Sequence, residues 1–135
     1  MKILDYNKIE GVKIFEPDMY TDFRGDLWTI WKEDEFPLDI HFNHDKFSSS
    51  RKNTLRGIHG DLYFVFVDNR EKSKTYMQWD YEILNDKSRK IVVIPPGVGT
   101  SFLVMSEHSV FGYKWSYTGE YPDVEDQFSI KWNDP

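Results

Sequence analysis

The chain has 135 residues, a formal net charge of −6 and no cysteine. This length fits one domain with one core, and the acidic balance argues against general binding of nucleic acid or anionic lipid, because both require a basic surface. The absence of cysteine excludes disulfides, thiolate nucleophiles and thiolate metal ligands. No stretch has the length and apolar character of a signal peptide or a membrane span, so we expect a cytoplasmic protein.

The predicted secondary structure is strand almost throughout. Ten Phe, eight Tyr and five Trp favour β-structure, and apolar side chains recur with a period of two. In chain order, the predicted strands are 11–17, 25–31, 39–47, 62–68, 75–84, 90–96, 101–105, 110–117 and 128–132. Eight or nine short strands in a single domain, residues 1–135, predict an all-β jelly-roll barrel or sandwich whose interior can hold a small ligand.

Three segments carry more specific expectations. Residues 32–38, "KEDEFPL", are compatible with one helical turn, and residues 48–53, "SSSRKN", read as a loop. Within 75–84, apolar residues alternate with polar ones, which predicts a half-buried strand with the apolar residues on one face. These apolar residues are Met77, Trp79, Tyr81 and Ile83.

The four histidines do not form a metal-binding pattern. His41 and His44 are three residues apart, which places them on opposite faces of a strand. His108 lies in the acidic turn "SEHS", and His59 has no histidine two residues away. We therefore expect no metal site.

His59 is the first candidate for chemistry, in the stretch "LRGIHG". A lone histidine between glycines is commonly a core residue with both ring nitrogens hydrogen-bonded. Arg56 is only three residues earlier, and a cation beside a neutral imidazole suits an anionic substrate. From these residues alone, both interpretations stay open.

Tyr113 is the second candidate, in "VFGYKWSY". Phe111, Tyr113, Trp115 and Tyr117 share one face of a regular strand. The plain interpretation is a core aromatic residue whose hydroxyl bonds to the backbone; the functional one is a general acid opposite a general base. Gly112 beside it lets a ligand approach the backbone.

Arg24 is the third candidate, in a predicted turn over residues 22–25 that leads into a strand. A turn arginine is usually a solvated surface charge, but its guanidinium can also grip a phosphate through two parallel hydrogen bonds. Spacing alone does not choose between these roles.

Taken together, the short motifs resemble a known family. The matching stretches are "GVKIFEPDMYTDFRGDLW", "FNHDKFSSSRKNTLRGIHGD", "VDNREKSKTYMQW", "IVVIPPGVG" and "FGYKWSYTGEYPDVEDQFSIKWNDP". Their order is similar to that of the dTDP-4-dehydrorhamnose 3,5-epimerase family of cupins, and within it they look closest to GDP-linked 4-keto-heptose epimerases. The resemblance implies a cupin jelly-roll, a homodimer, and a reaction that needs no metal or organic cofactor.

The resemblance also implies a reaction and its residues. The expected activity is epimerisation at C3 and/or C5 of a GDP- or dTDP-linked 4-keto sugar, for a surface polysaccharide. By motif, His59 is the expected base and Tyr113 the expected acid. The expected substrate-binding residues are Arg24, Arg56, Lys46 and Tyr121, and stacking on Tyr117 or Tyr121 would accept either nucleobase. The alternative is a cupin that binds a sugar nucleotide or a partner subunit without turnover.

The chain departs from the family pattern at three places. Between Gly60 and Asp68 it is shorter by about a hairpin, including a strand with a phosphate-binding lysine. It stops at "KWNDP", where family members continue with a tail whose aspartate orients the histidine; Asp61 or Asp45 are possible substitutes. Thr100 stands where rhamnose-type epimerases carry a histidine, so we expect a sugar pocket of another type.

Overall fold

The computed structural model describes residues 1–34, 36, 38, 40–51 and 61–116, and within them it contains ten strands and no helix. The strands are β1 (Lys2–Leu4), β2 (Lys13–Glu16), β3 (Met19–Asp22), β4 (Gly25–Trp28), β5 (His44–Arg51), β6 (Leu62–Asp68), β7 (Trp79–Leu84), β8 (Ile91–Val93), β9 (Val98–Val104) and β10 (His108–Trp115). The predicted all-β class is therefore confirmed. In this part of the chain no helix could cross a membrane.

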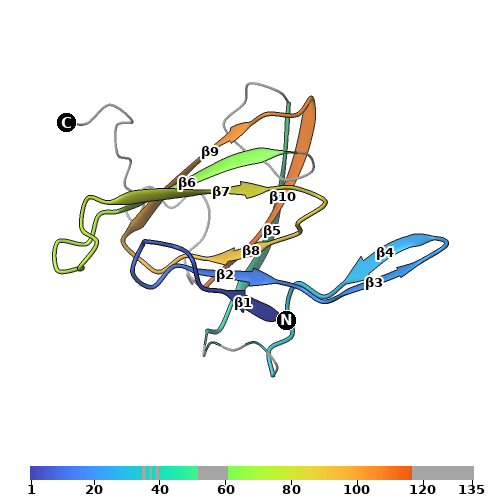
Figure 1. The fold of residues 1–135 in the computed structure, drawn as a ribbon, viewed down its shortest axis with the longest axis horizontal. Helices are drawn as coiled ribbons and strands as arrows, with labels where there is room; N and C mark the ends of the chain where they lie inside the picture. The colour runs from blue at the N-terminus through green and yellow to red at the C-terminus, as the bar shows by residue number, and fades with distance from the viewer. Residues whose placement is uncertain (35, 37, 39, 52–60, 117–135) are drawn as a thin grey trace.

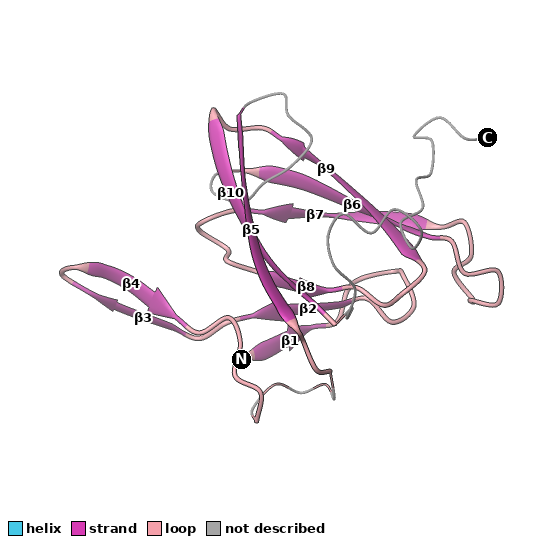
Figure 2. Ribbon diagram, turned by 180° about the vertical axis from the view of Figure 1, so that it is seen from behind, coloured by secondary structure: helices cyan, strands magenta, loops and turns pink. Residues whose placement is uncertain are grey.

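The strands form antiparallel sheets in the orders β1-β2-β8, β7-β6-β9 and β10-β5, with β3-β4 as a separate hairpin. In Figure 1, β9, β6, β7, β8, β2 and β1 follow one another as one curved layer, and the long β5–β10 pair crosses them. The reverse view in Figure 2 shows the same two layers. The β3–β4 hairpin, here called the arm, extends away from both layers.

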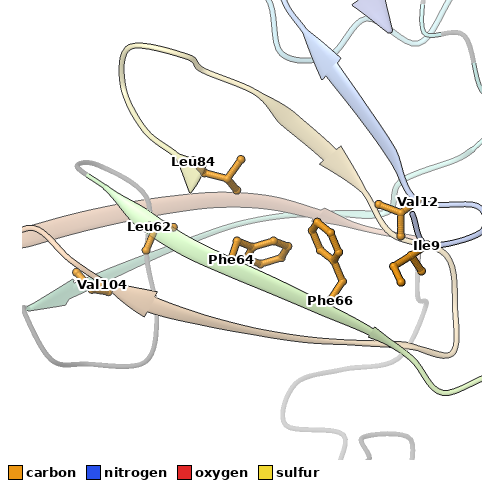
Figure 3. Packing of buried hydrophobic residues seen from close by; sticks show 7 residues of the cluster. All are labelled: Ile9, Val12, Leu62, Phe64, Phe66, Leu84 and Val104. Atoms are coloured by element: carbon orange, nitrogen blue, oxygen red, sulfur yellow. The ribbon is translucent and has the colours of Figure 1, made fainter. Parts of the chain in front are cut away.

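The core is centred on β6, which pairs with β7 on one side and β9 on the other. Its alternate residues Leu62, Phe64 and Phe66 are buried, as the period-two pattern requires. Figure 3 shows the buried cluster that they form, whose members are Ile9, Val12, Leu62, Phe64, Phe66, Leu84 and Val104. Removal of this apolar surface from water is the main source of stability.

The second layer closes over this core through aromatic contacts. The ring of Phe111 in β10 has its centroid 5.4 Å from that of Phe102 in β9 and 6.2 Å from that of Phe64 in β6. The inner face of the β5–β10 pair therefore looks toward β6 and β9, and residues on that face line the interior.

The predicted strand over 62–68 coincides with β6, whereas the loop predicted over 48–53 is wrong for residues 48–51. All eight residues of β5 pair with β10, so the serines continue the strand through backbone hydrogen bonds that need no apolar side chains. Within the predicted turn at 32–38, the Phe36 amide donates to the Lys32 carbonyl at 2.9 Å, while residues 35 and 37 lie outside the described residues. The short strands β1 and β3 were not predicted.

The two faces of β7 are the reverse of the predicted arrangement. Trp79 and Tyr81 are 59% and 46% exposed, whereas Glu82 is buried on the core side with Leu84. The buried carboxylate of Glu82 accepts hydrogen bonds from Lys90 Nζ at 2.6 Å and from the Tyr6 hydroxyl. These partners make burial of the charge tolerable. The apolar face of β7 therefore points to solvent.

A buried carboxylate organises the turn after β6. Asp68 is fully buried and accepts hydrogen bonds from Arg70 Nε and Nη2, both at 2.8 Å. It also accepts from the hydroxyls of Ser73 at 2.5 Å and Thr75 at 2.6 Å. The hydrogen bonds from Arg70 contribute most to holding the pKa of Asp68 far below its usual range.

Arg70 extends this network to two more segments. Its Nη2 donates to the carbonyl of Glu10, in the loop before β2. Its side chain also lies against Gly97, where a Cβ would be 2.6 Å from Arg70 Cγ and the φ angle is +85°. Only glycine fits this position without displacing the arginine. One buried ion pair therefore joins the turn after β6, the N-terminal loop and the turn before β9.

Candidate functional site

The inner face of the β5–β10 pair carries a polar column beside an aromatic one. His44, Lys46 and Ser48 of β5 are partly buried, while the residues between them are exposed. Directly paired residues on adjacent strands share a face. The pairs on this face are His44 with Trp115, Lys46 with Tyr113 and Ser48 with Phe111.

Tyr113 lies in the middle of the aromatic column. Its ring centroid is 5.3 Å from that of Phe111 and 5.7 Å from that of Trp115. Since Phe111 is packed on the core, the column leads from the core outward along β10. Within the described part of the chain, the Tyr113 hydroxyl has no hydrogen-bond partner, unlike the backbone-bonded core tyrosine of the plain interpretation.

Lys46 places a positive charge on the same face. Its Nζ is 3.7 Å from the centroid of the Trp115 ring, a cation–π contact that orients the ammonium group. Lys114, the neighbour of Tyr113, points to the opposite face, as predicted, and its Nζ is 2.5 Å from Asp45 Oδ1. Asp45 therefore faces away from Tyr113, which makes it a poor substitute for an orienting carboxylate on the inner face.

His44 is a residue of this face that the sequence analysis missed. Its Nδ1 is buried and lacks a hydrogen-bond partner in the structure as described. In the part of the chain that the structure describes, His44 has no partners for metal binding, but its two-residue spacing from Lys46 on a strand indicates that the two side chains share a face. Nearer the sheet centre, Thr100 pairs with Phe66 across β6–β9 and is exposed.

Arg24 lies in the turn between β3 and β4, and Figures 1 and 2 show that this hairpin extends away from the β5–β10 pair. Its side chain is 76% exposed, and its Nη2 is 2.6 Å from Asp22 Oδ2. Hydrogen bonds from Arg24 lower the pKa of Asp22. Within one chain, the structure does not bring Arg24 and Tyr113 together.

The remaining predicted site residues, His59, Arg56 and Tyr121, lie outside the described residues and stay predictions, as does Tyr117. Asp61 is exposed just before β6. Two hollows of about 340 and 270 Å³ are found beside β1 and the base of the arm, and Tyr113 lines neither. Among the described residues, no group of three or more histidines and carboxylates could hold a metal ion.

Comparison with known proteins gives consistent matches. Residues 6–135 match the family model described as dTDP-4-dehydrorhamnose 3,5-epimerase. Proteins of that name from Methanothermobacter thermautotrophicus and Salmonella typhimurium are 32% and 30% identical; the matches cover 94% and 99% of this chain and 77% and 82% of theirs.

Solved structures agree with these matches. A dTDP-6-deoxy-D-glucose-3,5-epimerase from Legionella pneumophila, in complex with dTDP-4-keto-L-rhamnose, gives a TM-score of 0.86 at 31% identity, covering 99% of this chain and 79% of that one. A dTDP-4-dehydrorhamnose 3,5-epimerase from Elizabethkingia anophelis gives a TM-score of 0.83 at 27% identity. This match covers 99% of this chain and 82% of that one. The predicted cupin fold is confirmed, whereas closeness to GDP-linked epimerases stays a prediction.

Within the matched region, a relative has residues that this chain lacks. In the alignment with the Methanothermobacter protein, 94% of 135 residues is about 127 residues, spread over 147 aligned positions. That relative therefore has about 20 residues within the matched region that have no counterpart here. A missing hairpin is of this size.

Proposed function

Because the chain belongs to the dTDP-4-dehydrorhamnose 3,5-epimerase family, we propose that it epimerises a nucleotide-linked 4-keto sugar at C3 and/or C5. Carbons beside a ketone are acidic because the enolate spreads the negative charge onto oxygen. A base removes the proton from one side, and an acid returns one to the other. A Bacillus subtilis relative, 27% identical, is named a spore coat polysaccharide biosynthesis protein, which supports a role in supplying a surface sugar.

The observation that carries this proposal is the position of Tyr113 on the inner face. Its hydroxyl is the proposed acid, and His59 is the proposed base. The C–H bond breaks as its proton passes to the imidazole, the electron pair becomes the enolate, and the phenol then donates its proton to the same carbon from the opposite side. Solvent afterwards restores the protonation of both residues.

Lys46 supports the same reaction by charge. Its ammonium group, held above Trp115 and across from Tyr113, is suited to a diphosphate or to the enolate oxygen. Arg56 is the proposed second cation for the phosphates, and Tyr121 the proposed stacking residue. Stacking accepts thymine and guanine alike, so both dTDP- and GDP-linked sugars are candidate substrates.

We further propose a homodimer in which the arm of one copy packs against the other. Phe23, Leu27 and Tyr20 of the arm are 98%, 71% and 70% exposed, although an isolated two-stranded hairpin is marginal in water. A second copy would cover these side chains. It would also receive Arg24 from the tip of the arm, which explains how an arginine distant from Tyr113 in its own chain can bind substrate.

The experiment is proton exchange in deuterated water, followed by NMR at C3 and C5 of dTDP- and GDP-linked 4-keto sugars. Inversion with deuterium incorporation is expected for one nucleotide series, and the Tyr63→Phe variant, altered on the outer face, serves as the matched control. Calorimetric binding of the sugar nucleotide without exchange at either carbon would support the binding-only alternative. Exchange that persists in a His59→Asn variant would reject His59 as the base.

A further inference from the structure

The side chain of Arg89 joins the arm to the body of the protein. Its Nη2 is 2.7 Å from Asp26 Oδ2, and its guanidinium carbon is 4.3 Å from the centroid of the Trp28 ring. Its Nη1 also contacts the sulfur of Met19 at 2.6 Å. Met19 and Trp28 are paired across the hairpin, so Arg89 contacts both strands at the end nearest the body.

Arg89 lies in the turn between β7 and β8, which is closed by hydrogen bonds to Asn85. The side-chain oxygen of Asn85 accepts hydrogen bonds from the Lys87 and Ser88 amides, and the Arg89 amide donates to the Asn85 carbonyl at 2.9 Å. Arg89 has a φ angle of +47°, uncommon for a residue with a side chain. Its side chain is only 14% exposed. The turn thus presents a largely buried guanidinium to the arm.

The other polar contacts of the arm's side chains, as far as the structure describes them, are internal. Thr21 donates to Asp26 at 2.6 Å, and Arg24 pairs with Asp22. All eight strand residues of the arm are exposed to solvent. Packing on the core therefore does not fix the direction in which the arm leaves the body.

We propose that Arg89 is a positioning residue that fixes the direction of the arm and thereby its fit against the second copy. The inference rests on the homodimer of the proposed function. A planar guanidinium pairs with Asp26 and stacks on Trp28 at the same time, which restrains both rotation and tilt of the hairpin. With this contact, the arm already has its bound orientation before association, so dimerisation loses less conformational entropy.

The test compares the full chain with its Arg89→Ala and Arg89→Lys variants. Hydrogen exchange of the amides at 19–28 is measured at a dilution where the chain is monomeric, and the dimer dissociation constant by sedimentation. For Arg89→Ala we expect about tenfold faster exchange in the arm and about tenfold weaker association, which lies between the contributions of an exposed and a desolvated cation–π contact. Arg89→Lys keeps the charge and loses the planar stack, so partial rescue is expected.

Two internal readouts separate positioning from general destabilisation. The hydrogen-exchange rates of the β6 amides should be the same in the parent chain and the Arg89 variants. The fluorescence of Trp28 is obtained by subtracting the spectrum of the Trp28→Phe variant, and its emission maximum should shift in the Arg89 variants relative to the parent chain. Equal protection of the arm in Arg89→Ala and the parent would overturn the proposal. Faster arm exchange and weaker association would support it even if the parent chain showed no epimerase activity, so the two failures are distinguishable.

Discussion

Lys46 lies directly across the β5–β10 ladder from Tyr113, with its ammonium group 3.7 Å from the centroid of the Trp115 ring. A phenol and a cation are therefore side by side on the face that looks into the fold. A cation there favours any state in which negative charge develops nearby, whether on a phosphate, an enolate or the phenolate itself.

Replacing Tyr113 by Phe removes the proposed acid and keeps the ring contacts with Phe111 and Trp115. We expect inversion of the substrate carbon to fall by about 100-fold or more, the usual contribution of a general acid. Deuterium should still enter from the face of the base, without inversion, because His59 is intact. NMR of the sugar in deuterated water measures both rates, and an undiminished inversion rate would contradict the assignment.

Replacing Lys46 by Met removes the charge on the inner face. We expect KM for the nucleotide sugar to rise about tenfold, as for the loss of one hydrogen bond to a charged group. Lys114→Met is the matched control, since that lysine has the same length and points to the opposite face toward Asp45. Equal effects of the two substitutions would mean that net charge, and not the position of Lys46, controls binding.

Replacing Leu27 by Asp places a charge on the exposed apolar surface of the arm. Because Leu27 is 71% exposed, the fold of the single chain should tolerate the change. The proposed dimer should weaken by about 100-fold, since the carboxylate would be buried without a partner. Sedimentation velocity against the parent chain checks this, and a dimer of unchanged affinity would exclude the arm from the interface.

Replacing Asp68 by Asn leaves Arg70 without its buried carboxylate. We expect the free energy of unfolding to fall by roughly 3 kcal/mol, as when one partner of a buried ion pair is removed. The double variant Asp68→Asn/Arg70→Met should lose less than the sum of the two single losses, because the partners act on one another. Urea unfolding measures all four chains, and strict additivity would show that the pair is not coupled.

The same pair gives a stability that depends on pH. The pKa of Asp68 is lowered in the folded chain, first by the hydrogen bonds from Arg70, so the ionised carboxylate is the form that stabilises the fold. Its contribution is complete above the unfolded pKa of about 3.9 and is lost as the pH falls toward the folded value. The stability difference between the parent chain and Asp68→Asn should therefore stay constant from neutral pH to about 5 and shrink below about 4. A difference that shrinks between neutral pH and 5 would contradict this.

The local alternation of apolar and polar residues predicted the strands that bury one apolar face. It did not predict the structure where hydrogen-bond partners come from distant parts of the sequence. The alternation in residues 62–68 was enough to define β6. The same rule predicted the wrong buried face for β7. Glu82 is buried there because Tyr6 and Lys90, which donate hydrogen bonds to its carboxylate, come from other segments of the chain. The serines of β5 read as a loop, because the strand that pairs with them is about 60 residues away in sequence.

The site shows the same division. Strand alternation correctly placed Tyr113 and Lys114 on opposite faces, and the turn at Arg24 was predicted as well. The local sequence does not predict that this turn lies away from the body, because the direction of the arm involves a contact with Arg89, which is distant in the sequence. The place of His44 on this face follows from its two-residue spacing from Lys46, a signal that is separate from metal binding.

The network around Asp68 also bears on how a chain without cysteine secures a long turn. Ten residues separate β6 from β7, and this turn, the N-terminal loop and the turn at Gly97 are all joined at one carboxylate and one guanidinium. Small secreted domains make such connections with disulfides, which a reducing environment breaks. In this chain the connection consists of the hydrogen bonds and the ion pair between Asp68 and Arg70. Reductants therefore leave it intact, whereas acid breaks it by protonating the carboxylate.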